Sequence, residues 1–234
     1  MFENNYLFDF HIHTKYSPDS YSDPVKIIKM AKRRNLSGFA ITDHNTIKGG
    51  LITKKMLGND EELTVIVGSE IQTDKGEVIG LFLSEEIGTF NFHEVCDSIR
   101  DQDGVILLPH PYRNKLANPE DLINNVDIIE SVNARNSKEL NSKSINLARM
   151  FNYPVVAGSD AHIPYEVGQV KTLLPKDMFI LEEDDIKSKI TKNQLIIDGS
   201  ESSFVPKTYS KVLGKYKKGG FNSLIKSSAK YLIR

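Results

Sequence analysis

The fold class of this chain is decided by two stretches of sequence, GVILLP at residues 104–109 and VDIIESV at residues 126–132. In both stretches apolar residues occupy consecutive positions. Runs of this kind are typical of strands that are buried on both faces, as in parallel sheets covered by helices. The two stretches therefore predict a sheet of buried, mainly parallel strands.

Five more segments have the length and composition of strands. They are Tyr6–His13, Gly38–Asp43, Leu63–Glu70, Glu77–Leu83 and Pro154–Gly158. Glu77 directly follows the turn sequence Asp74-Lys75-Gly76, so we expect the third and fourth strands to form a hairpin. Elsewhere the strands alternate with helical patterns, which indicates an α/β protein with mostly parallel pairing. Seven such strands predict a distorted, TIM-like (β/α)7 barrel in a single domain.

Local start signals predict helices between the strands. Asp23-Pro24 is typical of an N-cap followed by proline in the first turn, and Asn91 is the expected cap of a later helix. Asn118-Pro119-Glu120 is expected to begin a short helix. Two further helical segments are Lys138–Phe151 and Leu181–Asn193.

Composition limits the class of protein. The chain has 234 residues, enough for one substantial core, and its 39% hydrophobic and 26% charged residues are ordinary for a globular domain. No apolar run approaches the roughly 20 residues that cross a bilayer, so we expect no transmembrane segment. The first ten residues contain no basic residue, which disfavours a secretory signal, and Cys96 is the single cysteine. We therefore expect a cytoplasmic protein.

Charge is distributed unevenly along the chain. Residues 207–234 contain eight basic residues and no acidic residue, whereas the other 22 basic and 31 acidic residues give a charge of −9. We therefore divide the chain into a barrel domain, residues 1–206, and a basic C-terminal segment, residues 207–234. Apolar residues at helical spacing in this segment (Phe221, Leu224, Ile225 and Leu232) favour a helix that packs on the barrel. Peripheral contact with an anionic membrane or nucleic acid is the alternative.

Five of the six histidines lie at or just past the carboxyl end of a predicted strand, where β/α barrels build their active sites. His11 and His13 are two residues apart on one strand, so their side chains project from the same face and can converge on one metal ion. Asp160 and His162 repeat this spacing with a carboxylate and an imidazole. The sixth histidine, His93, lies within a predicted helix, and we expect it on the helix surface.

Other residues with metal-binding side chains also follow strand ends. They are Asp19, Asp43, His44, Glu70, His110, Glu130 and Asn133. Carboxylates this close together repel one another unless cations neutralise them. Nitrogen and oxygen ligands without cysteine favour Zn²⁺, Mn²⁺ or Fe²⁺. The sequence therefore predicts a metal centre at the carboxyl ends of the strands.

The motifs that carry these residues resemble those of a known family. FDFHIHTKYSPDS (residues 8–20), AITDHNT (40–46), GSEI (68–71), PHP (109–111) and GSDAH (158–162), in this order, resemble the PHP family, named after polymerase and histidinol phosphatase domains. The match runs from Phe8 to about Gly168. The resemblance implies a distorted seven-stranded barrel with two or three divalent metal ions and hydrolysis of phosphate esters.

The resemblance also implies which residues bind metal. They are His11, His13, Asp19, His44, Glu70, His110, Asp160 and His162. Glu70 would bridge two ions, and Asp19 stands where many relatives have a histidine. The sixth strand often supplies a further histidine to the second ion, and here it offers only Glu130 or Asn133, so this ligand stays open. Asp43 is expected to orient a ligand.

Cationic side chains near strand ends are candidates for holding a phosphate group. Arg113 and Arg135 are expected to act in catalysis with Glu70 and Asp160, and Arg113, Arg135, Lys15 and Asn133 are expected to line the substrate site. Short spacings between the motifs leave little room for an inserted domain, which favours a small phosphomonoester or nucleotide as substrate. The alternatives are an exonuclease or phosphodiesterase acting on nucleic-acid ends, and a non-catalytic metal-binding scaffold.

Overall fold

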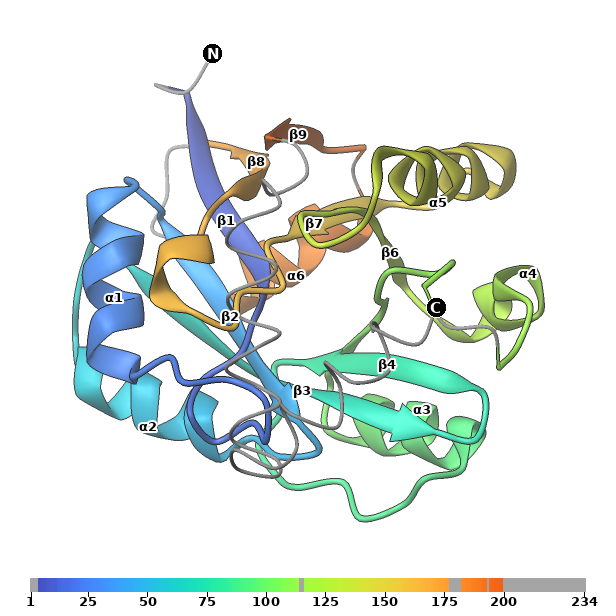
Figure 1. The fold of residues 1–234 in the computed structure, drawn as a ribbon, viewed down its shortest axis with the longest axis horizontal. Helices are drawn as coiled ribbons and strands as arrows, with labels where there is room; N and C mark the ends of the chain where they lie inside the picture. Colours follow the sequence, from blue (N-terminus) through green and yellow to red (C-terminus); the bar gives the residue numbers. More distant parts are fainter. Residues whose placement is uncertain (1–3, 114–115, 177–181, 193, 200–234) are drawn as a thin grey trace, which may run out of the picture.

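The computed structural model of the chain describes residues 4–113, 116–176, 182–192 and 194–199. In these residues nine strands form one sheet, in the order β7-β6-β5-β4-β3-β2-β1-β8-β9. The strands are β1 Asn5–Ile12, β2 Gly38–His44, β3 Thr64–Thr73, β4 Gly76–Leu81, β5 Val105–Leu108, β6 Ile128–Asn133, β7 Val155–Gly158, β8 Val170–Pro175 and β9 Ile196–Gly199. The end of β7 returns to β1, where Ile12 and Ala161 form a parallel bridge. The sheet is therefore a nearly closed barrel (Figure 1).

Strand direction determines which residues meet at each end of this barrel. β1, β2 and β3 are parallel to one another, and so are β5, β6 and β7. β4 is antiparallel to both β3 and β5, which confirms the predicted hairpin, and β8 is antiparallel to β1 and β9. The amino end of β4 therefore lies at the same edge as the carboxyl ends of its neighbours.

The predicted count of seven strands is wrong, because β8 and β9 extend the sheet beyond β1. β9 has four residues, and none of them is fully buried. Because β9 is not buried, its sequence IIDG does not form the continuous apolar run by which buried strands are recognised. The seven predicted strands all exist, with ends that differ by a few residues.

Helices cover the outside and one end of the barrel. They are α1 Pro24–Arg33, α2 Lys48–Leu57, α3 Phe92–Asp101, α4 Pro119–Leu122, α5 Lys138–Phe151 and α6 Glu183–Lys192, with short 3₁₀ turns η1 Ile123–Asn125 and η2 Pro164–Glu166. The Asp23 side chain accepts a hydrogen bond from the Val25 N–H, and Asn91 caps α3 in the same way. Both predicted caps are therefore confirmed.

The sequence analysis missed α2, which contains Gly49 and Gly50 and has no side-chain N-cap. Glycine weakens a helix by about 1 kcal/mol relative to alanine. At Gly49 a β-carbon would collide with the Asp43 carboxylate and the Thr14 hydroxyl. The residue that weakens the helix signal is thus the one that lets α2 approach the ends of β1 and β2.

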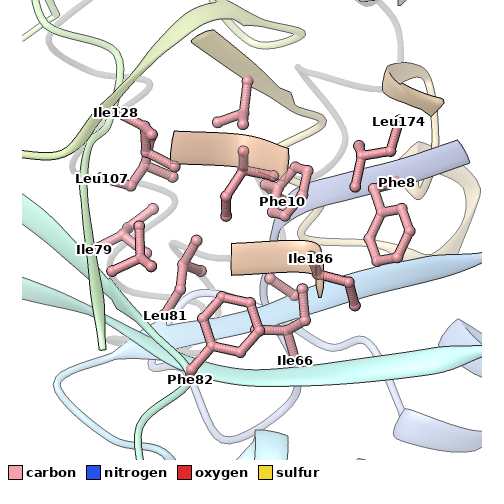
Figure 2. Close-up of a cluster of buried hydrophobic side chains, with 14 of the residues drawn as sticks. Phe8, Phe10, Ile66, Ile79, Leu81, Phe82, Leu107, Ile128, Leu174 and Ile186 are labelled. Atoms are coloured by element: carbon pink, nitrogen blue, oxygen red, sulfur yellow. The ribbon is translucent and has the colours of Figure 1, made fainter. Parts of the chain in front are cut away.

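The interior of the barrel is filled with apolar side chains, as Figure 2 shows for Phe8, Phe10, Ile79 and Leu107. Ile186 of α6 belongs to the same cluster. Lys187 of α6 pairs with Asp103, just before β5, at 2.6 Å, so α6 closes the barrel at the amino ends of the parallel strands. The opposite edge is left for polar side chains.

Two irregularities turn polar residues toward this interior. The pairing of β1 with β2 shifts between Asp9 and Ile12, and the pairing of β6 with β7 shifts between Glu130 and Val132. A bulge of this kind changes which residues face the interior. Phe10 packs in the interior while its neighbour His11 also faces inward, which strict alternation along β1 would forbid.

None of the described helices is long and apolar enough to cross a membrane. Residues 207–234, with the predicted basic helix, and the boundary at residue 206 lie outside the described residues. His93 is exposed on α3, as expected, and Cys96 of the same helix is buried.

Candidate metal centre

The eight metal ligands implied by the sequence motifs lie together at the carboxyl-end edge of the barrel. His11 is on β1, His44 ends β2, Glu70 is on β3, His110 follows β5, Asp160 and His162 follow β7, and His13 and Asp19 lie in the segment after β1. Six of them are buried, whereas His44 and Asp19 keep about a fifth of their side-chain surface exposed (21%). Five strand ends and their loops thus contribute to one cluster.

Glu70 is the centre of this cluster. Its Oε2 lies 3.3 Å from His11 Nε2, 3.3 Å from His13 Nε2 and 3.2 Å from His44 Nδ1. Its Oε1 lies 2.9 Å from His110 Nε2. One carboxylate therefore contacts four imidazoles through two oxygens, which is the arrangement of a bridging ligand.

Two aspartates connect the remaining imidazoles. Asp160 Oδ1 lies 3.5 Å from His13 Nε2 and 3.3 Å from His162 Nδ1. Asp19 Oδ2 lies 3.3 Å from His44 Nε2 and 3.4 Å from His162 Nε2. Asp19 therefore joins His44 to His162.

This arrangement fits divalent metal ions. The described residues contain four groups of three His or Glu side chains whose ligand atoms lie within 4.8 Å of one another. His11 Nε2 and His13 Nε2 are 3.0 Å apart, close to the roughly 3.3 Å expected for two nitrogens on one tetrahedral ion with bonds of about 2.0–2.1 Å. The donor atoms are imidazole nitrogens and carboxylate oxygens, which suit Zn²⁺, Mn²⁺ or Fe²⁺.

A second layer of polar groups orients the ligands. His11 Nδ1 lies 3.0 Å from Glu130 Oε1, and His13 Nδ1 lies 3.1 Å from Ser17 Oγ. Metal-binding histidines usually hold the second ring nitrogen in this way. Asp43 accepts the Thr14 N–H and hydroxyl, each at 2.6 Å, and so holds the segment after β1 that carries His13.

The sixth strand supplies hydrogen bonds to the cluster. Glu130 Oε2 accepts the His110 N–H at 2.8 Å and the Asn133 amide at 2.9 Å. Asn133 Oδ1 accepts Arg113 Nη2 at 2.6 Å and the Arg135 N–H at 2.9 Å. Glu130 and Asn133, between which the sequence analysis did not decide, therefore both make hydrogen bonds outside the set of expected ligands.

The three cationic candidates differ in position. Arg113 donates from Nη1 to Asp160 Oδ2 at 2.5 Å and from Nε to Asn136 at 3.0 Å, and its side chain is 30% exposed. Arg135 lies 3.4 Å from the buried Glu166. Lys15 pairs with Asp23 at 2.8 Å on the surface. Arg113 therefore lies within the cluster, Arg135 beside it, and Lys15 at an exposed ion pair.

Electrostatics within the cluster are those of carboxylates held by cations. Burial alone would raise the pKa of Asp160, but Arg113 and His11 hold it well below its usual range. Burial likewise opposes ionisation of Glu70, yet His11 and His44 lower its pKa well below the usual value. The pKa of His13 rises to about 9 against the effect of burial, because Asp160 and Glu70 accept from it. A divalent ion would take over this neutralising role and release the protons.

Two further acids were missed by the sequence analysis, the half-buried Glu77 and the buried Glu166. Glu77 lies on β4, with its Oε2 3.8 Å from His110 Nε2, and burial together with the charge of Glu70 raises its pKa. Glu166 of η2 accepts the His162 N–H at 2.9 Å. The predicted hairpin could have indicated Glu77, because an antiparallel strand begins where its parallel neighbours end.

A nearly closed β/α barrel with buried imidazoles and carboxylates at the carboxyl ends of its strands defines a class of metal-binding barrel proteins. The family model described as PHP-associated matches residues 138–195. An uncharacterised protein of Methanocaldococcus jannaschii is 32% identical over 204 residues, which cover 82% of this chain and 80% of that protein. The chain belongs to the PHP family.

Other similarities agree with this assignment. A probable phosphatase of Acetivibrio thermocellus is 26% identical over 223 residues, covering 80% of this chain and 91% of that protein. A two-domain protein of Bacteroides vulgatus that contains a predicted PHP-like metal-dependent phosphoesterase has a TM-score of 0.70 and 16% identity, with 84% of this chain and 65% of that chain covered. The lesion-specific endonuclease Q of Pyrococcus furiosus has a TM-score of 0.61 and 16% identity, with 82% and 57% covered. At such identities the two structures show a shared fold.

Proposed function

We propose that this chain is a metal-dependent phosphoesterase that hydrolyses a small phosphomonoester or nucleotide. The observation that carries the proposal is Glu70, whose two oxygens lie within 3.3 Å of four imidazole nitrogens from three strand ends. The probable phosphatase of Acetivibrio thermocellus, similar over 80% of this chain, supports the reaction class.

Two or three divalent ions would be held by the eight residues of the cluster. Bound ions supply a water of lowered pKa and neutralise phosphoryl oxygens. Glu70 would hold two of them together, and Asp160 would share one with His13. Mn²⁺, Zn²⁺ and Fe²⁺ are the candidates, because the donors are nitrogen and oxygen.

The cationic side chains would bind the substrate. The partly exposed guanidinium of Arg113 can donate to a phosphate oxygen while it keeps Asp160 in position. Arg135, which lies beside the cluster next to Glu166, would also act in catalysis. Asn133 would line the site through its contact with Arg113, and Lys15 would add an outer positive charge.

Chelation followed by metal restoration tests the proposal. Exhaustive metal removal is expected to abolish hydrolysis of a generic chromogenic phosphate ester, and Mn²⁺, Zn²⁺ or Fe²⁺ is expected to restore it. The Glu139→Gln variant, taken through the same treatment, is expected to behave like the wild type, because this carboxylate lies exposed on α5 in a pair with Lys143. Full activity in metal-free protein would contradict the proposal.

A substrate panel separates the remaining functions. Endonuclease Q, which shares the fold, has been solved with a duplex that carries an abasic lesion, so action on nucleic acid is the second candidate. The panel therefore contains phosphomonoesters, mononucleotides, and oligonucleotides with intact ends and with an abasic site. Preference for an oligonucleotide would favour the nuclease, and a metal-loaded chain that hydrolyses no member would favour a scaffold.

A further inference from the structure

We propose that Glu77, on the antiparallel strand β4, is a metal ligand of this centre and takes the position that the resemblance assigns to the sixth strand. The inference deepens the proposed function and rests on it to the extent that the centre binds divalent ions. Glu77 belongs to none of the sequence motifs that carry the resemblance, and it lies outside the sixth strand.

The two residues of the sixth strand are engaged elsewhere. Glu130 uses one oxygen on His11 Nδ1, the ring nitrogen that faces away from Glu70, and the other on the His110 N–H. Asn133 accepts from Arg113 and donates to Glu130. These contacts orient ligands, which is the usual work of residues that surround a metal site. A ligand atom of Glu130 lies within 4.8 Å of those of His11 and His110, but both Glu130 oxygens already accept hydrogen bonds, so another strand can supply the further ligand of the ion beside His110.

Strand geometry brings Glu77 to this ion. In the hairpin Glu70 pairs with Ile79 and Gln72 with Glu77. Ile79 belongs to the interior core, so Glu77, two residues earlier on β4, projects from the same face. A diagonal pair on neighbouring strands is about 7–8 Å apart at the backbone, within reach of two glutamate side chains.

The observed contacts agree with this placement. His110 Nε2 lies 2.9 Å from Glu70 Oε1 and 3.8 Å from Glu77 Oε2, so two carboxylates face one imidazole nitrogen. Ligand atoms of His44, Glu70 and Glu77 lie within 4.8 Å of one another. The Glu77 side chain is 18% exposed, which leaves it little access to solvent.

Charge balance gives an independent reason. Five carboxylates meet here (Asp19, Glu70, Glu77, Glu130 and Asp160), and Arg113 neutralises one of them. With neutral imidazoles, four negative charges remain, and two divalent ions neutralise four. Carboxylates as close as Glu70 and Glu77 repel each other unless a cation lies between them.

The test measures metal binding directly in the full-length chain. Wild type, Glu77→Gln and the exposed control Glu139→Gln are stripped of metal and reloaded with Mn²⁺, Zn²⁺ or Co²⁺. Bound ions per chain are counted by mass spectrometry, the affinity of the weakest ion is titrated, and the Co²⁺ absorption spectrum is recorded. Glu77→Gln is expected to lose one ion, or to bind it at least about tenfold more weakly with an altered Co²⁺ spectrum, while Glu139→Gln matches wild type.

Unchanged ion count, affinity and Co²⁺ spectrum in Glu77→Gln would overturn the inference. If this variant fails to fold, Glu77→Asp replaces it: the shorter side chain withdraws the carboxylate, so a weaker ion and an altered spectrum support ligation, and wild-type values overturn it. A wild-type chain that binds ions and hydrolyses nothing would contradict the proposed function alone, because the ion count still decides the role of Glu77. A wild-type chain that binds no divalent ion would overturn both.

Discussion

Replacing Arg113 by lysine separates the geometry of the guanidinium from its charge. Arg113 donates three hydrogen bonds, to Asp160 at 2.5 Å, to Asn133 at 2.6 Å and to Asn136 at 3.0 Å. A lysine ammonium keeps the charge beside Asp160, but it has no planar fork with which to reach both amides. Arg113→Lys should therefore leave the metal ions bound but lose the hydrogen bonds to the side-chain amides of Asn133 and Asn136.

The size of the effect follows from the acceptors that remain. Asn133 Oδ1 still accepts the Arg135 N–H, so losing its bond to Arg113 costs about 0.5–1.5 kcal/mol. Asn136 is buried and likewise loses a hydrogen bond from Arg113, which costs about 0.5–1.5 kcal/mol. Arg113→Lys should lower the free energy of unfolding by about 1–3 kcal/mol. If Arg113 also holds a phosphate oxygen, kcat/KM should fall about tenfold or more, since tenfold corresponds to about 1.4 kcal/mol.

Urea unfolding, kcat/KM on the phosphate ester and the ion count are measured on the same preparations. Arg149→Lys, on the exposed face of α5, is the matched control and should change none of them. An unchanged kcat/KM in Arg113→Lys would remove this residue from phosphate binding. Loss of a metal ion would mean that Arg113 acts by holding the ligand Asp160. Unchanged stability would refute the hydrogen-bond accounting.

Two more substitutions address other parts of the centre. Glu70→Gln removes the charge shared by four imidazoles, so activity should fall by orders of magnitude while the chain still folds, as circular dichroism can verify; near-normal turnover with a normal ion count would exclude the bridging role. Glu166→Ala removes the acceptor of the His162 N–H and the partner of Arg135, so the ion held by His162 should bind about 10–100-fold more weakly, whereas Glu166→Gln, which still has an acceptor oxygen, should recover most of the affinity. Equal affinity in all three proteins would show that η2 does not position His162.

The strand ends could be predicted because they depend on local rules. Consecutive apolar residues and capping motifs mark buried strands and helix starts, and histidines that follow strand ends converge once the strands are parallel. Asp23 and Asn91 cap helices as expected, and the expected ligands meet at one edge. These features can be predicted from the neighbouring residues in the sequence and from the direction of the strand.

The missed features depend on contacts between distant segments. α2 contains two glycines, so its helical signal is weak. At one of them, Gly49, a β-carbon would collide with the Asp43 carboxylate. Gly158 similarly admits His11 and Glu130, which would collide with a β-carbon there. The bulges in β1 and β6 depend on register with neighbouring strands. Such requirements cannot be read from residues adjacent in the chain.

Glu77 and Glu166 illustrate how a reversal of chain direction moves a residue across the barrel. In a fully parallel barrel only carboxyl ends reach the polar edge, so a search confined to them finds the histidines and Glu70. β4 runs the other way, and its first residues therefore lie beside the last residues of β3 and β5. Glu166 lies before β8, the other antiparallel strand, and reaches the backbone of His162 from there. Glu77 thus lies at the start of one reversed strand and Glu166 shortly before the other, so in a mixed barrel the amino ends of antiparallel strands can supply ligands as much as the carboxyl ends of parallel ones.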